Sequence, residues 1–278
     1  MAKGLTLGGF STAVDLLKCE AAALRSVLKV ESRGSGFDRK GRVLILFEPH
    51  VFHEQLMKHG TSLQLKAAIV RGVAYPTWGE KPYPADSYPT LLSAIAINPE
   101  LAHRAASWGA GQLLGRNFKL CGYDSATKMA DDFTRGEDVQ LLAMACFIAA
   151  NPRMLKALQE KDWETFALCY NGKGYKKNRY HLKLAAAYAE FRADPLRGLK
   201  VVAVSPSVGQ TQVDVRRSNI ETATGTVVAT GAGTGAALGG FTVKDALITG
   251  GVILSLALVA TLIINRFSAL SERNPQLG

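Results

Sequence analysis

The sequence has few cysteines, and none of them is closely paired with another. Structural zinc sites usually draw their ligands from closely spaced Cys and His residues, so a chain without a Cys-x-x-Cys pattern is not predicted to hold one. The cysteines stand singly in apolar stretches, which indicates buried free thiols. They are Cys19, Cys121, Cys146 and Cys169.

Histidine is also scarce, and its densest stretch lacks a complete set of metal ligands. His50, His53 and Glu54 have a helical spacing that suits a metal ion, but no further ligand is evident. We therefore expect no metal and no other cofactor.

Acidic residues are outnumbered, with 23 Asp and Glu against 33 Lys and Arg, which leaves a net charge of +10. A basic chain favours anionic partners such as nucleic acid, acidic lipid or bacterial wall polymers. The three tryptophans do not form a spaced stacking platform, which argues against nucleic acid as the partner. Residues 171–183 hold five basic residues and no acid, a pattern that suits wall-peptide carboxylates, lipid headgroups or simply a solvated face.

No secretory signal is predicted from the first residues, since one lysine precedes only a short apolar run that Asp15 interrupts. Residues 246–264, by contrast, are nineteen positions without a charge. At 1.5 Å per residue they span about 28 Å, close to the hydrocarbon thickness of a bilayer. We expect a transmembrane helix there.

Residues 223–243 form a second uncharged stretch, with a glycine at every fourth position from Gly231 to Gly239. This spacing allows close helix packing in a membrane, whereas the same composition also suits a flexible tether. Basic residues flank the outer ends of both stretches, which fits a helical hairpin with both ends in the cytoplasm. The predicted organisation is a domain at 1–194, a linker at 195–222 and a membrane-associating tail at 223–278.

The fold class expected for residues 1–194 is mainly α (α+β), with one small β-hairpin. A first helix ends before residue 37, a polar turn and a β-branched run at 37–47 form the hairpin, and residues 71–89 form an irregular loop with four prolines. Helical periodicity predicts the remaining helices, at 50–58, 88–97, 98–107, 111–120, 125–134, 137–150, 152–160, 163–169 and 180–192.

The first helix carries an acid on its apolar face. Glu31 continues a stripe at steps of four, three, four and three residues, and Gly34 and Gly36 mark the helix C-terminus. Apolar surroundings and the C-terminal partial charge both raise the pKa of a carboxyl, so Glu31 is a candidate proton donor near neutral pH. The alternative is that Glu31 reaches solvent at a frayed helix end. The stripe consists of Leu17, Ala21, Leu24, Leu28 and Glu31.

Three segments together resemble a known superfamily. They are a helix-ending Glu31-Ser32, the turn from Ser107 to Gln112, and the loop from Tyr170 to Tyr175. In this order and at comparable separations they resemble the goose-type lysozyme and lytic transglycosylase superfamily. Over about residues 10 to 192 the sequence is similar more closely to the phage endolysin N-acetylmuramidase family, in the stretches LFEPHVF, SWGAGQLLG, CGY and DWETFALCYNGKGY.

The resemblance implies a lysozyme-like domain and a set of substrate-binding residues. Gln112 and the backbone around it would hydrogen-bond the acetamido sugar, Tyr170 would orient Glu31, and Asn171 with Gly172 would shape the floor. The superfamily's usual Gly-Leu-Met-Gln is Gly109-Ala110-Gly111-Gln112 here, which leaves small side chains at that subsite. Taken singly, Tyr170 also fits a core tyrosine and Gly172 a helix cap. The substrate-binding set is Ser32, Ser107, Gly109, Gln112, Tyr170, Asn171, Gly172 and Tyr175.

The chemistry that the resemblance implies is cleavage of the β-1,4 bond between N-acetylmuramic acid and N-acetylglucosamine in peptidoglycan. Glu31 is the candidate general acid, and Glu48, at the end of the predicted strand, is the candidate second carboxylate. If no second acid acts, the sugar's own hydroxyl attacks and an anhydro product results. A non-catalytic, membrane-anchored wall-binding or lysis-regulatory protein is the alternative of another class. The expected partners are peptidoglycan and, through the tail, the inner membrane of a host bacterium, with the protein held on the cytoplasmic side before lysis and acting in the periplasm.

Overall fold

The computed structural model describes residues 4–32 and 35–199. Helices make up most of this part of the chain, and three short strands form its sheet. The helices are α1 Leu7–Leu17, α2 Ala21–Ser32, α3 Pro49–His59, α4 Ser62–Val70, α5 Tyr88–Ile95, α6 Pro99–Arg104, α7 Ala126–Phe133, α8 Glu137–Ala149, α9 Pro152–Glu160, α10 Trp163–Asn171 and α11 Tyr180–Phe191, the 3-10 turns are η1 Gly115–Asn117 and η2 Lys173–Tyr175, and the strands are β1 Ile45–Phe47, β2 Ala106–Trp108 and β3 Leu113–Leu114.

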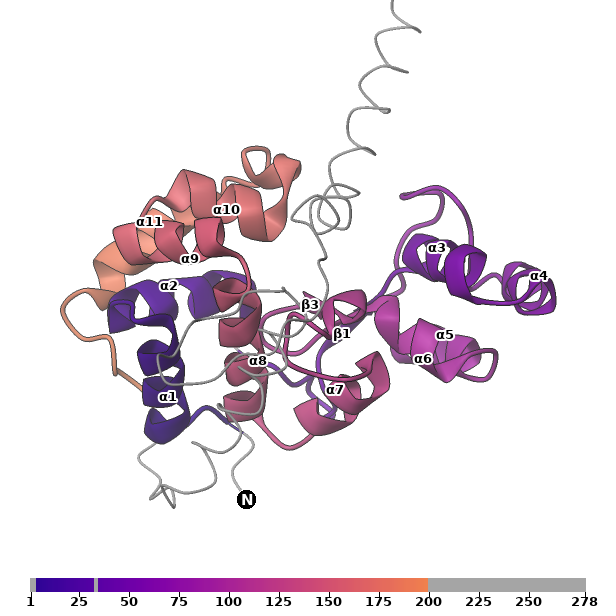
Figure 1. Ribbon diagram of the computed structural model, residues 1–278, viewed down its shortest axis with the longest axis horizontal. Coiled ribbons are helices and arrows are strands. Elements are labelled where there is room, and N and C mark those ends of the chain that lie inside the picture. The colour runs from indigo at the N-terminus through magenta and orange to yellow at the C-terminus, as the bar shows by residue number, and fades with distance from the viewer. Residues whose placement is uncertain (1–3, 33–34, 200–278) are drawn as a thin grey trace, which may run out of the picture.

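The small sheet lies between two groups of helices (Figure 1). On one side α1 and α2 pack with α8 and α11, and α9 packs with α10. On the other side α6 packs against α3, α5 and α7, with α4 outside them against α3. The mainly α architecture with a minor β element is thus confirmed.

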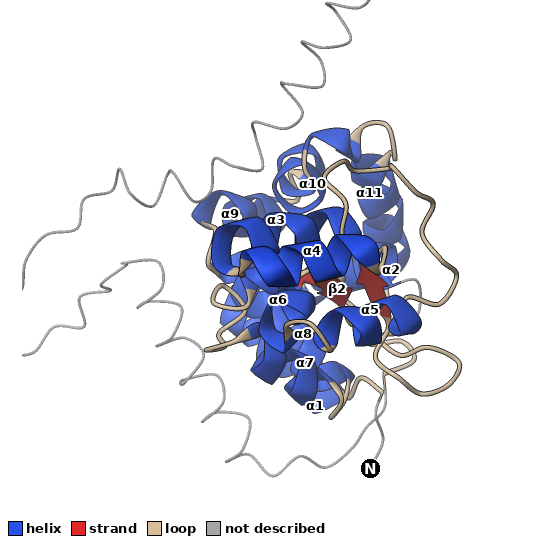
Figure 2. Cartoon of the chain, turned by 90° about the vertical axis from the view of Figure 1, so that its right-hand side faces the viewer, coloured by secondary structure: helices blue, strands red, loops and turns tan. Residues whose placement is uncertain are grey.

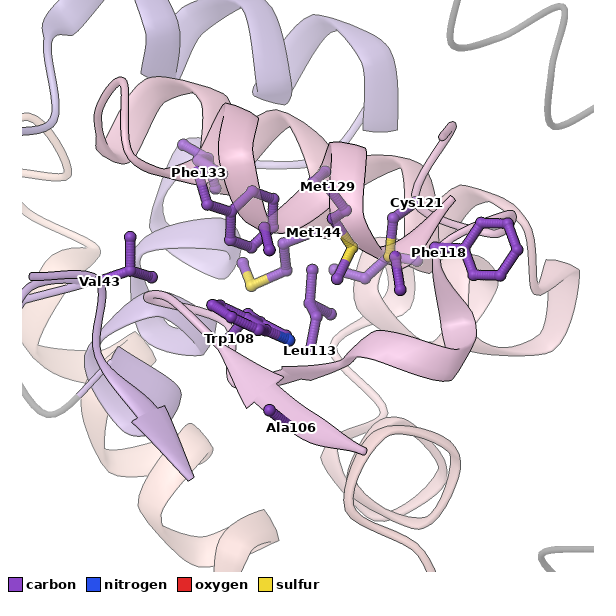
Figure 3. Packing of buried hydrophobic residues seen from close by; sticks show 14 of the residues in the cluster. Val43, Ala106, Trp108, Leu113, Phe118, Cys121, Met129, Phe133 and Met144 are labelled. Atoms are coloured by element: carbon purple, nitrogen blue, oxygen red, sulfur yellow. The ribbon is translucent and has the colours of Figure 1, made fainter. Parts of the chain in front are cut away.

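Helix α8 forms the centre of the core. Nine of its residues are buried, and they are distributed over all faces of the helix. Between this helix, α7 and the sheet lie Trp108 and Leu113 from the strands, Phe133 from α7 and Met144 from α8 (Figure 3). These side chains pack the sheet against α7 and α8. The turn that follows β2 is therefore positioned by the core.

The sheet is antiparallel in the order β1-β2-β3. Leu46 pairs with Ser107, and Ser107 pairs with Leu114, while an isolated bridge joins Phe37 to Val43. The strand predicted within residues 37–47 is therefore present as β1. Its partner in the sheet is β2, which itself forms a hairpin with β3. The helix predicted at 111–120 is wrong, since those residues form β3 and η1 instead. Gly115 explains the difference, because a Cβ at this position would lie 1.9 Å from the His103 carbonyl oxygen.

The N-terminal region contains two helices where the sequence predicted one. Lys18 has a left-handed backbone with φ of 47°, which ends α1 and puts Leu17 on a different helix from Glu31. At the start of α1, Thr6 donates through both its backbone N–H and its hydroxyl to Asp138 on α8. Helix α4 was not predicted, and three of its large apolar side chains, Leu63, Ile69 and Val70, are exposed to solvent.

The helices from α5 to α11 begin close to their predicted residues, but the helix predicted at 98–107 ends at Arg104, because residues 106–107 pair with β1 as part of β2. Asn98 and Asp162 accept hydrogen bonds from the third residues of their helices, as expected for N-caps. Ser125, rather than the expected Asp124, caps α7. Residues 71–87 form the predicted irregular loop.

The predictions for the linker and the tail concern residues that mostly lie outside the described part of the chain. The linker at 195–222 is described only to residue 199, and both uncharged stretches, 223–243 and 246–264, fall wholly outside it. Within residues 4–32 and 35–199, no single helix is long and apolar enough to cross a bilayer; only α8 and α9 taken together reach that length and composition, and they meet at a bend of 106°.

The four thiols are free in the described structure, and their environments differ. Cys121 and Cys146 are buried, whereas Cys19 and Cys169 are partly exposed. No group of three or more His, Cys, Asp or Glu side chains suited to a metal ion occurs among the residues described.

Candidate active site

Glu31 lies in the last turn of α2, with its side chain turned toward the end of α10. The Asn171 amide Nδ2 donates to Glu31 Oε1 at 3.0 Å. Leu24 and Leu28, on the same helical face, are buried in the core beneath it. Glu31 is therefore held by a neighbour and partly covered, and it does not extend freely into solvent.

The Glu31 carboxyl holds its proton more tightly than an ordinary glutamate. Burial raises its pKa from 4.5 to about 7, while the Asn171 amide and the positive charge of Lys183 act in the opposite direction. Loss of hydration thus outweighs both stabilising contacts, as expected for an acid in apolar surroundings. Near neutral pH a substantial fraction of Glu31 is protonated.

Glu48 occupies the position directly after β1, where it precedes Pro49 and α3. The Ser107 hydroxyl donates to its Oε1 at 3.2 Å, and His50 Nε2 lies 3.7 Å from its Oε2. Burial raises the pKa of Glu48, whereas the Ser107 hydroxyl and the Arg116 charge favour the ionised form. The second candidate carboxyl and Ser107 are thus neighbours across the β1–β2 pair.

The turn from Gly109 to Gln112 has a strained backbone. Gly109 has φ of +65°, and Gln112 has φ of 45°, which side chains other than glycine rarely adopt. The Gln112 side chain donates from Nε2 to the Gly109 carbonyl at 2.9 Å and lies 3.4 Å from the Leu44 carbonyl. This side chain therefore closes the turn on itself and links it to β1.

The Gln140 side chain from α8 supports the same turn, a role that the sequence analysis did not predict. Its Oε1 accepts from the Ala110 backbone N–H at 2.8 Å, and its Nε2 donates to the Phe133 carbonyl at 3.0 Å. The side chain is completely buried. A glutamine inside the otherwise apolar run of α8 was the available signal, because a buried amide needs partners.

Tyr170 connects the α10 end to this turn. Its hydroxyl donates to the Gly111 carbonyl at 2.8 Å, while its ring stacks on Phe166 and meets Phe147 edge-on. Burial raises the pKa of the phenol well above its ordinary value, and the nearby Glu31 charge adds to this. The expected roles are therefore corrected: Asn171 contacts Glu31, and Tyr170 holds the turn.

The contact between the Tyr170 hydroxyl and the Gly111 carbonyl leaves little room for a side chain at position 111. A Cβ there would lie 3.1 Å from the Tyr170 hydroxyl oxygen and 3.0 Å from Met144 Sδ. A large apolar side chain in this position would meet both atoms. The departure from Gly-Leu-Met-Gln is thus matched by the packing beneath the turn.

The other expected site residues lie around these contacts. Gly172 ends α10 with φ of +75°, a conformation that suits glycine. Tyr175 is buried and packs edge-on against His181, and Ser32 is buried and lines a pocket that also reaches Ala110. Ser32 and Tyr175 thus have mainly buried, supporting positions.

Each candidate carboxyl is therefore linked to the segment 106–112: Glu48 through the Ser107 hydroxyl, and Glu31 through Asn171, whose neighbour Tyr170 bonds the Gly111 carbonyl. A family model for N-acetylmuramidase matches residues 20–192, which include every one of these residues. The chain belongs to the N-acetylmuramidase family. It is a glycoside hydrolase of the lysozyme type, and peptidoglycan is its substrate class.

A solved structure supports the same assignment. The chain is 36% identical to a protein described as "Crystal structure of Burkholderia AP3 phage endolysin", with a TM-score of 0.63 over 69% of this chain and 73% of that one. Among curated proteins, none matches.

Replacement of Gln140 by leucine tests the support of the turn. Gln140→Leu leaves the Ala110 N–H and the Phe133 carbonyl buried without partners, so the free energy of unfolding is expected to fall by about 2 to 5 kcal/mol. Gln159→Leu, which loses a single bond to the Leu17 carbonyl, is the control and is expected to cost about 1 kcal/mol. Urea denaturation measures both. Equal losses would show that Gln140 has no special role.

Replacement of Glu31 by glutamine tests the cost of burying the acid. A native pKa raised from 4.5 to about 7 means that the folded state binds the proton more tightly, so stability falls as pH rises between these values and the full penalty is present above pH 7. Glu31→Gln should therefore be more stable than the parent above pH 7, by roughly 3 kcal/mol, and equal to it well below pH 4.5. Thermal denaturation across this range measures the difference. A difference in stability between Glu31→Gln and the parent that does not change with pH would contradict the raised pKa of Glu31.

Proposed function

We propose that this chain is an endolysin that cleaves the β-1,4 bond between N-acetylmuramic acid and N-acetylglucosamine. The observation that carries the proposal is the Glu31 carboxyl, which has a pKa of about 7 and contacts Asn171. Cleavage of a glycosidic bond requires a proton on the departing oxygen, and an acid with this pKa supplies one near neutral pH.

In the first step Glu31 donates its proton to the glycosidic oxygen, and positive charge develops on the sugar ring that keeps the anomeric carbon. Asn171 then stabilises the carboxylate that Glu31 becomes, since the amide donates to Oε1. The Asn171 Oδ1 atom is buried and has no hydrogen-bond partner among the described residues.

Glu48 is the proposed second carboxylate. Burial raises its pKa, and the Ser107 hydroxyl and the Arg116 charge act against this rise by favouring the ionised form. The proposed mechanism requires Glu48 to be ionised while Glu31 is protonated. An ionised Glu48 either activates a water molecule or supports the oxocarbenium-like state. Activity should then fall as pH rises through the pKa of Glu31, and fall again in acid as Glu48 becomes protonated.

We also propose that the enzyme acts in lysis of a host bacterium and is held at the inner membrane by its tail. The solved relative is named as a phage endolysin, which supports the first part. The uncharged run at 246–264 supports the second, because its length matches a bilayer. The protein would then wait on the cytoplasmic side and act in the periplasm.

The direct test of the chemistry uses purified peptidoglycan. Glu31→Gln removes the proton donor while keeping the shape of the side chain, so the rate of muropeptide release is expected to fall about 10³-fold with unchanged circular dichroism. Glu160→Gln, which changes an exposed carboxyl on α9 that lies 3.8 Å from Lys156, is the matched control and should keep full activity.

Mass spectrometry of the products decides between the two enzymatic outcomes. Hydrolysis gives reducing ends, whereas attack by the sugar's own hydroxyl gives anhydro ends that are lighter by one water. Glu48→Gln should abolish hydrolysis if Glu48 is needed for it. Binding of peptidoglycan with no soluble fragments, by the parent protein, would favour a non-catalytic wall-binding role.

Cell fractionation tests the tail. The full-length chain is expected in the membrane fraction and released only by detergent, because residues 246–264 are long enough to span the bilayer. A chain ending at residue 194 should be soluble and active. Recovery of the full-length protein in the soluble fraction without detergent would remove the membrane role.

A further inference from the structure

Helix α4 carries large apolar side chains on its outer surface. Val70 is 87% exposed, Leu63 78% and Ile69 48%, whereas Ala68 is fully buried. A surface helix of a soluble domain usually has the opposite arrangement, with its apolar stripe toward the core. The sequence pattern alone therefore did not predict this helix.

The exposed residues of α4 share one face. At helical spacing, Lys66 lies in the middle of the exposed arc, with Ile69 on one side and Leu63 and Val70 on the other, while Ala68 lies opposite. We call this the α4 face, and its residues are Ser62, Leu63, Lys66, Ile69 and Val70.

The α4 face lies at one end of the molecule. In Figure 1 α4 is the outermost helix on the side of the sheet away from α2 and α11, and in Figure 2 it lies in front of the other helices of that side. Met57, in the last turn of the preceding α3, is 63% exposed. No other element of the described chain covers this face.

The surroundings of the α4 face are basic. Between Glu54 and Glu80 the sequence contains no acidic residue, but it contains Lys58, Lys66 and Arg71. Lys58 pairs with Glu54, whereas Lys66 and Arg71 are exposed and form no ion pair within residues 4–32 and 35–199. An apolar face with unpaired positive charge is complementary to a surface that is apolar inside and anionic outside.

We propose that the α4 face docks on the surface of an anionic lipid bilayer. Leu63, Ile69 and Val70 would enter the boundary between headgroups and acyl chains, and Lys66 would extend its ammonium group to the phosphates. Basic residues near an anionic leaflet each add to such binding. This site lies on described residues and does not depend on the tail.

Other occupants fit the α4 face less well. In a symmetric dimer the same patch meets itself, which would bring the Lys66 and Arg71 charges of both copies together. An anionic wall polymer would neutralise those charges but would leave Leu63 and Val70 in water, since they are aliphatic and cannot stack on sugars. Lipid satisfies both the charge and the apolar surface.

Hydrogen exchange of the full-length chain tests this docking locally. The chain is mixed with vesicles of phosphatidylcholine alone, or of phosphatidylcholine and phosphatidylglycerol in equal amounts, and exchange is followed in peptides from residues 61–72. The expected result is exchange about tenfold slower on the anionic vesicles only, and reversed by high salt. Peptides from residues 246–264 report tail insertion separately, so the two membrane contacts are distinguishable.

Matched variants assign the protection to the α4 face. Leu63→Glu with Val70→Glu, and separately Lys66→Glu, should each abolish the slowing. Leu182→Glu on α11, where the leucine is 47% exposed, and Lys156→Glu on α9 are the controls and should keep it. All five substituted positions are exposed, and circular dichroism checks that each variant is folded.

Three results would overturn the proposal. The first is equal exchange on both vesicle types, and the second is protection that the α4 variants retain. The third is protection of residues 61–72 without any vesicles, because this would mean that a second copy or the chain's own tail covers the face. Light scattering would separate those two occupants.

Discussion

The loss of hydration around the Glu31 carboxyl is the constraint on which the rest of the site depends. Burial raises its pKa to about 7 even though Asn171 and Lys183 favour the charged form. The core below α2 provides this burial, and Asn171 at the end of α10 provides a neutral donor to the acid. An arginine in place of Asn171 would hold the carboxyl equally well but would lower its pKa, and the acid would then be unable to donate.

The second constraint is the position of the turn from Gly109 to Gln112. Glycine at 109 allows the left-handed backbone, and Gln112 closes the turn on itself. Gln140 from α8 and Tyr170 from α10 bond the turn from two other directions. Each bond comes from a buried or half-buried side chain, so the turn is rigid for the same reason that the core is.

Sequence reasoning identified the helix-ending Glu31, the turn and the Asn171 loop because each has a local pattern. It also located α5 to α11 well, since proline, asparagine and aspartate mark their first residues. It failed where long-range contacts decide the structure. The segment 111–120 has helical periodicity, but pairing with β2 and the His103 carbonyl beside Gly115 make it a strand and a 3-10 turn. A glutamine in the apolar run of α8 indicates a buried amide, but the sequence does not indicate that its partners are Ala110 and Phe133, nor that Tyr170 bonds the Gly111 carbonyl.

Titration of the Glu31 carboxyl itself measures most directly whether burial raises its pKa. Carbon-13 labelling of the glutamate side chains, with Glu31→Gln to assign the resonance, follows one carboxyl as pH changes. The account predicts a midpoint near the value of about 7 that burial imposes on Glu31. A midpoint near 4.5, the value of an ordinary glutamate, would show that the acid is hydrated and would contradict its role as the proton donor.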